Sequence, residues 1–253
     1  MRYVIVTVPS RRLACGRNAS LTLRSMRDDL RDEIEREYVV ERKGWAAQRA
    51  LRVTDRLQRG LAAGEPLDTL IVWWSEHSAF TTFGRTIYIS RRLFERLPDD
   101  EAAAFVIAHE IAHHRLGHIP KHIPSKLLPA HLVLAMIERL LCSPRHESDA
   151  DKLAIELCIS AGYDPERCIV ALDILSLVSL DYGDVDGVLG SEQRRSHPAL
   201  NDRIAAVRAH VASGARVDVQ RSITSERERP GRRILTAVGD AASALFALRR
   251  SPR

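Results

Sequence analysis

The sequence lacks any long apolar segment. No stretch reaches the roughly twenty apolar residues that a membrane-spanning helix requires. The nearest is the segment 127–141, which is interrupted by Pro129, His131, Glu138 and Arg139. The apolar run from Tyr3 to Val8 is shorter than the apolar core of a secretory signal. We therefore expect no transmembrane helix and a cytoplasmic protein.

Cysteine is also scarce. The 253 residues include four cysteines, Cys15, Cys142, Cys158 and Cys168, and no two of them have the spacing of a CxxC motif or a zinc knuckle. This excludes a cysteine-rich disulfide scaffold and a cysteine zinc site. Reduced, mostly buried thiols are the expectation for such a protein.

Lysine is nearly absent, so arginine supplies almost all of the positive charge. The chain has a formal net charge of +5, and its only lysines are Lys43, Lys121, Lys126 and Lys152. Positive charge gathers in residues 11–59 and 194–253. Solvated helices explain this pattern best, although basic ends also fit peripheral contact with an anionic membrane. We expect no nucleic-acid partner.

Against these absences stands one informative motif, His-Glu-Ile-Ala-His at residues 109–113. A capping Asp99 or Asp100 and a run rich in helix formers predict that it lies on a helix. Residues four apart on a helix are separated by about 40° around its axis, so His109 and His113 share a face and can hold one zinc ion. Glu110 lies about 100° from His109, which suits a base acting on water rather than a ligand.

A catalytic zinc site requires a third protein ligand. The metzincin motif would need glycine and histidine where the chain has Leu116 and Ile119. A second helix, opened by Ser143-Pro144, instead offers Glu147 as ligand. Asp151 lies four residues further on the same face and would accept the free ring N–H of a ligating histidine. The alternative is an acidic helix start without a metal.

A second histidine pair, His114 and His118, is also spaced by four residues. On a continued helix its face is rotated about 140° from the midpoint of the first pair. We therefore interpret His118 as a helix C-terminal residue favoured by the helix dipole, not as a ligand.

Four segments, in this order, resemble peptidase family M48, the group of the CAAX prenyl protease and HtpX. They are residues 78–90, which resemble an edge-strand motif, 101–118 around HExxH, 147–151 as ExxxD, and 196–204 as the late His-Pro signature. The chain departs from the edge-strand motif at Ser78, where Asn is usual, and at Arg85, where Gly is usual. The resemblance implies an α+β, mainly α-helical, zincin-like (gluzincin) domain with a small sheet or hairpin beside the HExxH helix.

The resemblance also implies a zinc-dependent endopeptidase with one zinc ion per chain. His109, His113 and Glu147 would bind the metal, and Glu110 would be the general base. His197 would stabilise the oxyanion, and Arg203 would pair with Glu147 or Asp151. A protein or peptide substrate in extended or unfolded form would pair with an edge strand containing Ser78, Ala79 and Phe80.

The expected organisation is an N-terminal extension (1–43), a peptidase domain (44–212) and a basic linker with a C-terminal helix (213–253). Strands are expected at 1–9 and 69–75, the latter pairing with 85–89, and helices at 20–40, 44–63, 91–97, 127–141, 167–180 and from about 198. Two other hypotheses are a zinc-binding but proteolytically silent relative that acts as a binding or chaperone-like module, and a basic scaffold with an accidental HExxH. The intact Glu110 argues against the former.

Overall fold

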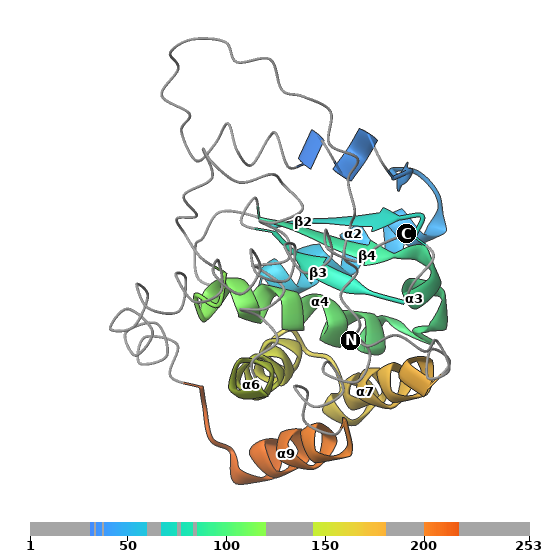
Figure 1. Ribbon diagram of the computed structural model, residues 1–253. Helices are drawn as coiled ribbons and strands as arrows, with labels where there is room; N and C mark the ends of the chain where they lie inside the picture. Colours follow the sequence, from blue (N-terminus) through green and yellow to red (C-terminus); the bar gives the residue numbers. More distant parts are fainter. Residues whose placement is uncertain are drawn as a thin grey trace, which may run out of the picture.

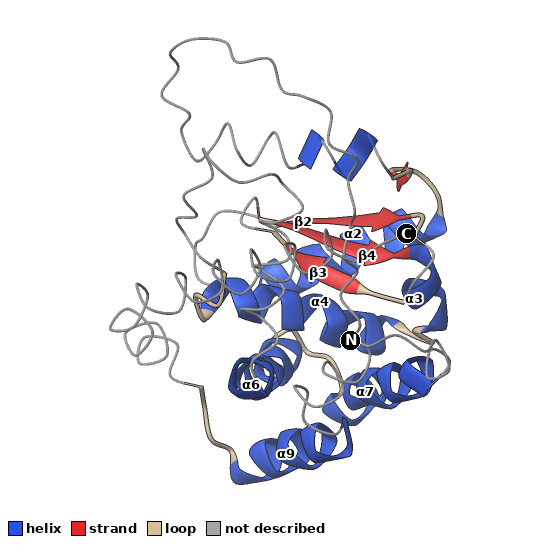
Figure 2. Cartoon of the chain, in the orientation of Figure 1, coloured by secondary structure: helices blue, strands red, loops and turns tan. Residues whose placement is uncertain are grey.

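The computed structural model describes residues 31–32, 34–36, 38–59, 67–74, 77–82, 85–119, 144–180 and 200–217. Figures 1 and 2 show a small sheet over a central helix, α4 (Asp100–Arg115), with further helices on the opposite side of α4. The predicted strand at 1–9, the predicted helix at 127–141 and the C-terminal helix lie outside the described residues.

The sheet has four strands in the order β1-β2-β4-β3. Their bounds are β1 Val40–Glu41, β2 Asp68–Val72, β3 Ala79–Thr81 and β4 Thr86–Ser90. The predicted pairing of β2 with β4 is present, but it is parallel, so these two strands do not form a hairpin. The chain between them contributes β3, which pairs antiparallel with the other side of β4. The edge strand expected at Ser78, Ala79 and Phe80 is therefore present as β3, at the end of the described sheet.

The predicted helix over 20–40 extends too far. Residues 31, 32 and 34–36 are helical, but Val40 and Glu41 form β1 and pair antiparallel with Val72 and Ile71. A β-branched residue beside an apolar strand gains more from strand pairing than from a further helical turn. Strand β1 thus supplies one edge of the described sheet.

Arg85 adopts φ 61°, in the left-handed region that favours glycine. It lies directly before β4, where its backbone N–H bonds to the Thr82 carbonyl and its carbonyl accepts from Asp68 N–H. This is the position at which the family pattern expects glycine. The turn before β4 therefore has the left-handed backbone conformation that glycine adopts easily, although the residue here is arginine.

The remaining helices match the predicted ones to within a few residues. They are α2 Trp45–Arg59, α3 Arg91–Arg96, α6 Pro144–Ser160, α7 Pro165–Leu180 and α9 Leu200–Ser213. Helix α4 packs against α2, α6, α7 and β3. Residues 102–113 of α4 are all buried, which is why its sequence shows no polar face. The predicted fold class, mainly helical α+β with a small sheet, is confirmed.

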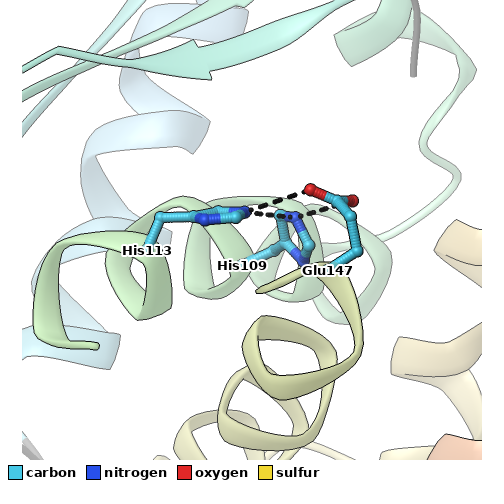
Figure 3. A group of neighbouring side chains, drawn as sticks. All are labelled: His109, His113 and Glu147. Carbon is cyan, nitrogen blue, oxygen red and sulfur yellow. Dashed lines mark hydrogen bonds and ion pairs between the residues drawn. The ribbon is translucent and has the colours of Figure 1, made fainter. Parts of the chain in front are cut away.

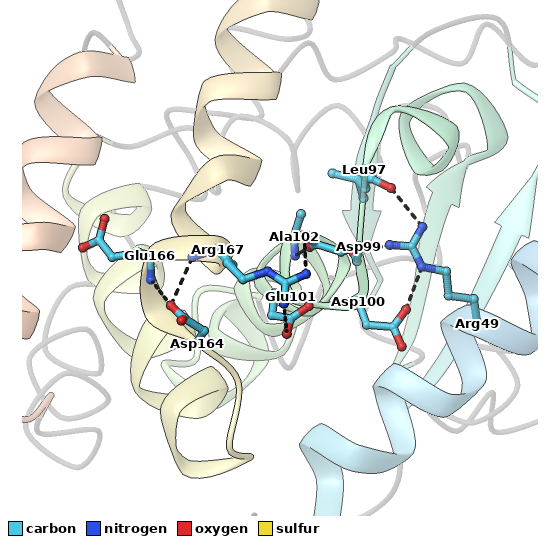
Figure 4. A network of polar contacts seen from close by, with 9 residues as sticks. All are labelled: Arg49, Leu97, Asp99, Asp100, Glu101, Ala102, Asp164, Glu166 and Arg167. Carbon is cyan, nitrogen blue, oxygen red and sulfur yellow. Dashed lines mark hydrogen bonds and ion pairs between the residues drawn. The ribbon is translucent and has the colours of Figure 1, made fainter.

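The N-terminus of α4 is fixed by charged side chains from two other helices (Figure 4). Asp99 caps the helix by accepting the N–H of Ala102 at 2.9 Å. Arg167 of α7 contacts Asp99 at 3.0 Å and Glu101 at 3.2 Å. Arg49 of α2 donates to the Leu97 carbonyl and pairs with Asp100 at 2.8 Å. These contacts hold α4 in register with α2 and α7.

The C-terminus of α4 is a Schellman turn. Gly117 has φ 73°, its N–H bonds to the His114 carbonyl, and the N–H of His118 bonds to the His113 carbonyl at 3.0 Å. Helix α6 ends in the same way at Gly162, φ 77°. The turn after α4 reverses the chain and brings His118 back beside His113.

In the part of the chain that the structure describes, no helix is long and apolar enough to cross a membrane.

Candidate metal centre

Three of the predicted site residues meet at one point between α4 and α6 (Figure 3). His109 Nε2 and His113 Nε2 are 3.0 Å apart. Glu147 places Oε1 3.4 Å from His113 Nε2 and Oε2 3.6 Å from His109 Nε2. All three side chains are buried, and theirs is a cluster that can hold a metal ion.

The spacing of these atoms fits zinc. Ligands bound tetrahedrally at the 2.0–2.2 Å typical of zinc lie about 3.3 Å from one another. The three observed separations, 3.0 to 3.6 Å, bracket that value. Neither carboxylate oxygen of Glu147 has a hydrogen-bond partner among the described residues. The carboxylate does form an ion pair with Arg203. Buried acceptor atoms that converge in this way can hold a cation between them.

The imidazole of His109 is supported by charged groups. Its Nδ1 lies 2.9 Å from Asp151 Oδ1 on α6. Arg203 of α9 holds Asp151 with two contacts of 2.6 and 2.7 Å and also reaches Glu147 Oε2 at 3.1 Å. Three helices therefore meet in one buried charged network. Arg203 was predicted to pair with either Glu147 or Asp151, and in the structure it contacts both.

Burial and these neighbours shift the ionisation of the network. Burial alone would lower the pKa of His109, but the carboxylates of Glu147 and Asp151 raise it overall. For Glu147, burial is outweighed by His109, His113 and Arg203, which hold its pKa well below the usual range. Arg203 likewise lowers the pKa of Asp151 against the effect of burial. Both carboxylates are therefore ionised and suited to a cation.

The imidazole of His113 contacts another histidine, a contact that the sequence analysis did not predict. Its Nδ1 lies 2.9 Å from Nδ1 of His118, not from a carboxylate. The His118 ring stacks on that of His146, with centroids 4.1 Å apart and planes inclined by 12°. Burial lowers the pKa of His118 to about 2, so this imidazole is neutral. His118 lies just beyond the C-terminus of α4, as predicted, and is not one of the three clustered residues, but the turn at Gly117 directs its neutral ring toward His113 instead of leaving it to interact with the helix dipole.

Glu110 lies on the same helix as the two histidines and is fully buried. Neither of its carboxylate oxygens has a hydrogen-bond partner among the described residues. Burial raises its pKa to about 7, partly offset by His109. A carboxyl group of this kind can both accept and return a proton near neutral pH.

The predicted substrate strand is β3, which has only β4 as a neighbour among the described strands. Ala79 belongs to the main core beneath the sheet, and Thr81 Oγ1 contacts the ring of His114 on α4. Phe80 points to the other face, where it packs on Tyr88 and Trp74. Ser78 is buried and receives the N–H of Ser90 on its carbonyl. The strand thus lies directly beside the HExxH helix.

His197, the predicted oxyanion residue, lies outside the described residues. Its predicted role stays a prediction, while α9, which follows it, begins at Leu200.

Comparison with known families agrees with this geometry. Peptidase family M48 matches residues 45–142 and 125–211, which include α4, α6 and all but the last two residues of α9. The chain belongs to this family, and its members are metal-dependent peptidases that act on proteins. No match was found among curated proteins.

Proposed function

We propose that this chain is a zinc-dependent endopeptidase that hydrolyses peptide bonds in extended or unfolded protein segments. The observation that carries the proposal is the convergence of His109, His113 and Glu147, with Glu110 one residue from the first ligand. Membership of the family supports peptide hydrolysis in general. The nitrogen and oxygen donors, and their spacing of 3.0 to 3.6 Å, support zinc as the ion.

A zinc ion held by these three side chains would supply Lewis-acid chemistry, polarising the scissile carbonyl and making water more acidic. Glu110 accepts a proton from the attacking water and later transfers it to the leaving amine. Its burial among apolar residues of α4 keeps the carboxyl group available for both transfers. His197 would donate a hydrogen bond to the oxyanion of the tetrahedral intermediate.

The substrate would bind as an added strand on the open side of β3. Edge strands carry unpaired backbone groups, so an extended peptide can pair with them irrespective of its sequence. Contact between β3 and α4, through Thr81 and His114, would place that peptide along the helix that bears the ligands. Folded substrates do not offer a free extended segment, which is why unfolded ones are preferred.

The peptidase domain would span residues 44–212, with extensions at 1–43 and 213–253. The family match covers almost the same range, and helices α2, α4, α6, α7 and α9 pack together within it. The N-terminal extension adds β1 to the sheet, on the side opposite β3. It therefore leaves the proposed substrate edge open in the described residues.

Glu110→Gln tests the chemistry. The substitution removes the base and keeps the shape, so cleavage of unfolded casein should fall about 10²- to 10⁴-fold. Zinc content should remain at the wild-type level, because Glu110 is not a ligand. Glu95→Gln, which changes an exposed glutamate paired with Arg91 on α3, is the matched control and should cleave normally. Chelator-sensitive cleavage that survives in Glu110→Gln would contradict the role of Glu110.

A further inference from the structure

The ring of His118 contacts a proposed metal ligand, which a residue that only fills the core would not need to do. His118 follows the end of α4, yet the turn at Gly117 brings its ring back to within 2.9 Å of a ligand histidine. Its side chain is buried at 5% exposure. The two atoms that meet are Nδ1 of His118 and Nδ1 of His113.

Two imidazole nitrogens at this distance share one proton. If His118 Nδ1 donates, His113 carries its proton on Nε2, the atom that faces His109 and Glu147. That arrangement blocks metal binding. If His113 Nδ1 donates instead, its Nε2 offers a free lone pair to the ion, and His118 carries its own proton on Nε2.

We propose that His118 is a positioning residue for the metal, its Nδ1 accepting the proton of His113 Nδ1 and so fixing the metal-binding tautomer of His113. This inference rests on the proposed ligand set. It assigns to a neutral imidazole the task that Asp151 performs for His109.

The stacked ring of His146 completes the arrangement. His146 precedes Glu147 on α6, so the 4.1 Å stack joins the C-terminal turn of α4 to the segment that carries the third ligand. The stack sets the plane of the His118 ring, and the plane decides where its Nδ1 points. The proposed hydrogen bond and the stack can be separated by mutation.

The test compares two substitutions of His118 by zinc affinity, measured by competition with a chromophoric chelator. His118→Phe keeps the ring and the stack but removes the acceptor, and should weaken zinc binding about 10- to 100-fold. His118→Asn removes the ring but keeps an acceptor at the Nδ1 position, and should stay within about tenfold of wild type. His210→Phe makes the same exchange at a histidine that contacts Glu156 instead of the ligand residues, and should bind zinc normally.

A second measurement needs no variant. Long-range ¹H–¹⁵N spectra of the zinc-loaded protein should place the proton of His113 on Nδ1 and that of His118 on Nε2. Wild-type affinity in His118→Phe, equal losses in His118→Phe and His118→Asn, or a proton on Nδ1 of His118 would each overturn the inference. A wild-type protein that binds no zinc would instead overturn the ligand set itself, so the two failures are distinguishable.

Discussion

The two histidines of the HExxH motif stand one helical turn apart but are supported in opposite ways. His109 rests on a charged network of Asp151 and Arg203, which joins α4, α6 and α9. His113 contacts the neutral ring of His118, which in turn stacks on His146 at the junction of α4 and α6. One ligand thus depends on long-range assembly and the other on a local turn.

The difference shows that a symmetrical motif need not imply a symmetrical environment. A carboxylate behind a ligand histidine increases its basicity and fixes its orientation. A neutral acceptor fixes the orientation but adds no negative charge. We therefore expect changes on the His109 side to affect both folding and metal binding, and changes on the His113 side to affect mainly metal binding.

The largest effect on stability should follow from Arg203→Leu, which removes the cation of the charged network behind His109. The substitution leaves Asp151 and Glu147 as buried carboxylates without their cation. We expect the free energy of unfolding of the metal-free protein to fall by about 3–5 kcal/mol. Urea unfolding followed by circular dichroism measures this loss.

Arg208→Leu is the control for that experiment. Arg208 lies on the same helix but pairs with Glu166 at the surface, where both side chains are more than half exposed. Its removal should cost under about 1 kcal/mol. Similar losses in the two variants would show that the buried network does not have the stabilising role given to it here.

A smaller effect should follow when His109, like His113, is given a neutral partner. Asp151→Asn retains a hydrogen-bond acceptor for His109 but removes the negative charge, as at His113. Zinc affinity should fall about 10- to 100-fold, in the range found when such supporting groups are changed. Chelator competition measures the change, with Asp149→Asn on the same helix as control. Unchanged affinity would mean that the charge behind His109 is irrelevant to the metal.

The smallest effect concerns the turn that places His118. Gly117→Ala forces a side chain into the left-handed region, which costs about 1–2 kcal/mol of stability. Gly162→Ala, at the equivalent position of α6, should cost a similar amount. Only Gly117→Ala should also weaken zinc binding, because only that turn carries a residue of the site. Equal zinc affinities in Gly117→Ala and Gly162→Ala would show that the turn at Gly117 does not influence the metal centre.

Local sequence patterns predicted most of the elements that carry the site. The HExxH helix and the helix with Glu147 were recognisable from spacing, capping residues and helix formers, and the resemblance to the family supplied their partnership. Arg203 was expected to pair with one of two carboxylates and contacts both.

The features that could not be predicted depend on reversals of the chain. His118 was assessed as though α4 continued, whereas the helix ends at Arg115 and Gly117 turns the chain back. The parallel pairing of β2 and β4 was similarly hidden, because β3 lies between them in sequence but beyond β4 in the sheet. A helical or strand period carries no information past the residue at which the element ends.

The most direct test of the central claim is the zinc content of purified wild type, Glu147→Gln and Glu156→Gln, measured by elemental analysis after dialysis against zinc and then buffer. Both substituted glutamates lie on α6, but Glu156 contacts His210 instead of the ligand histidines. We predict one zinc ion per chain in wild type and Glu156→Gln, and a marked loss in Glu147→Gln with its helical content retained. Equal zinc in all three proteins, or none in wild type, would contradict the assignment of His109, His113 and Glu147 as the metal site.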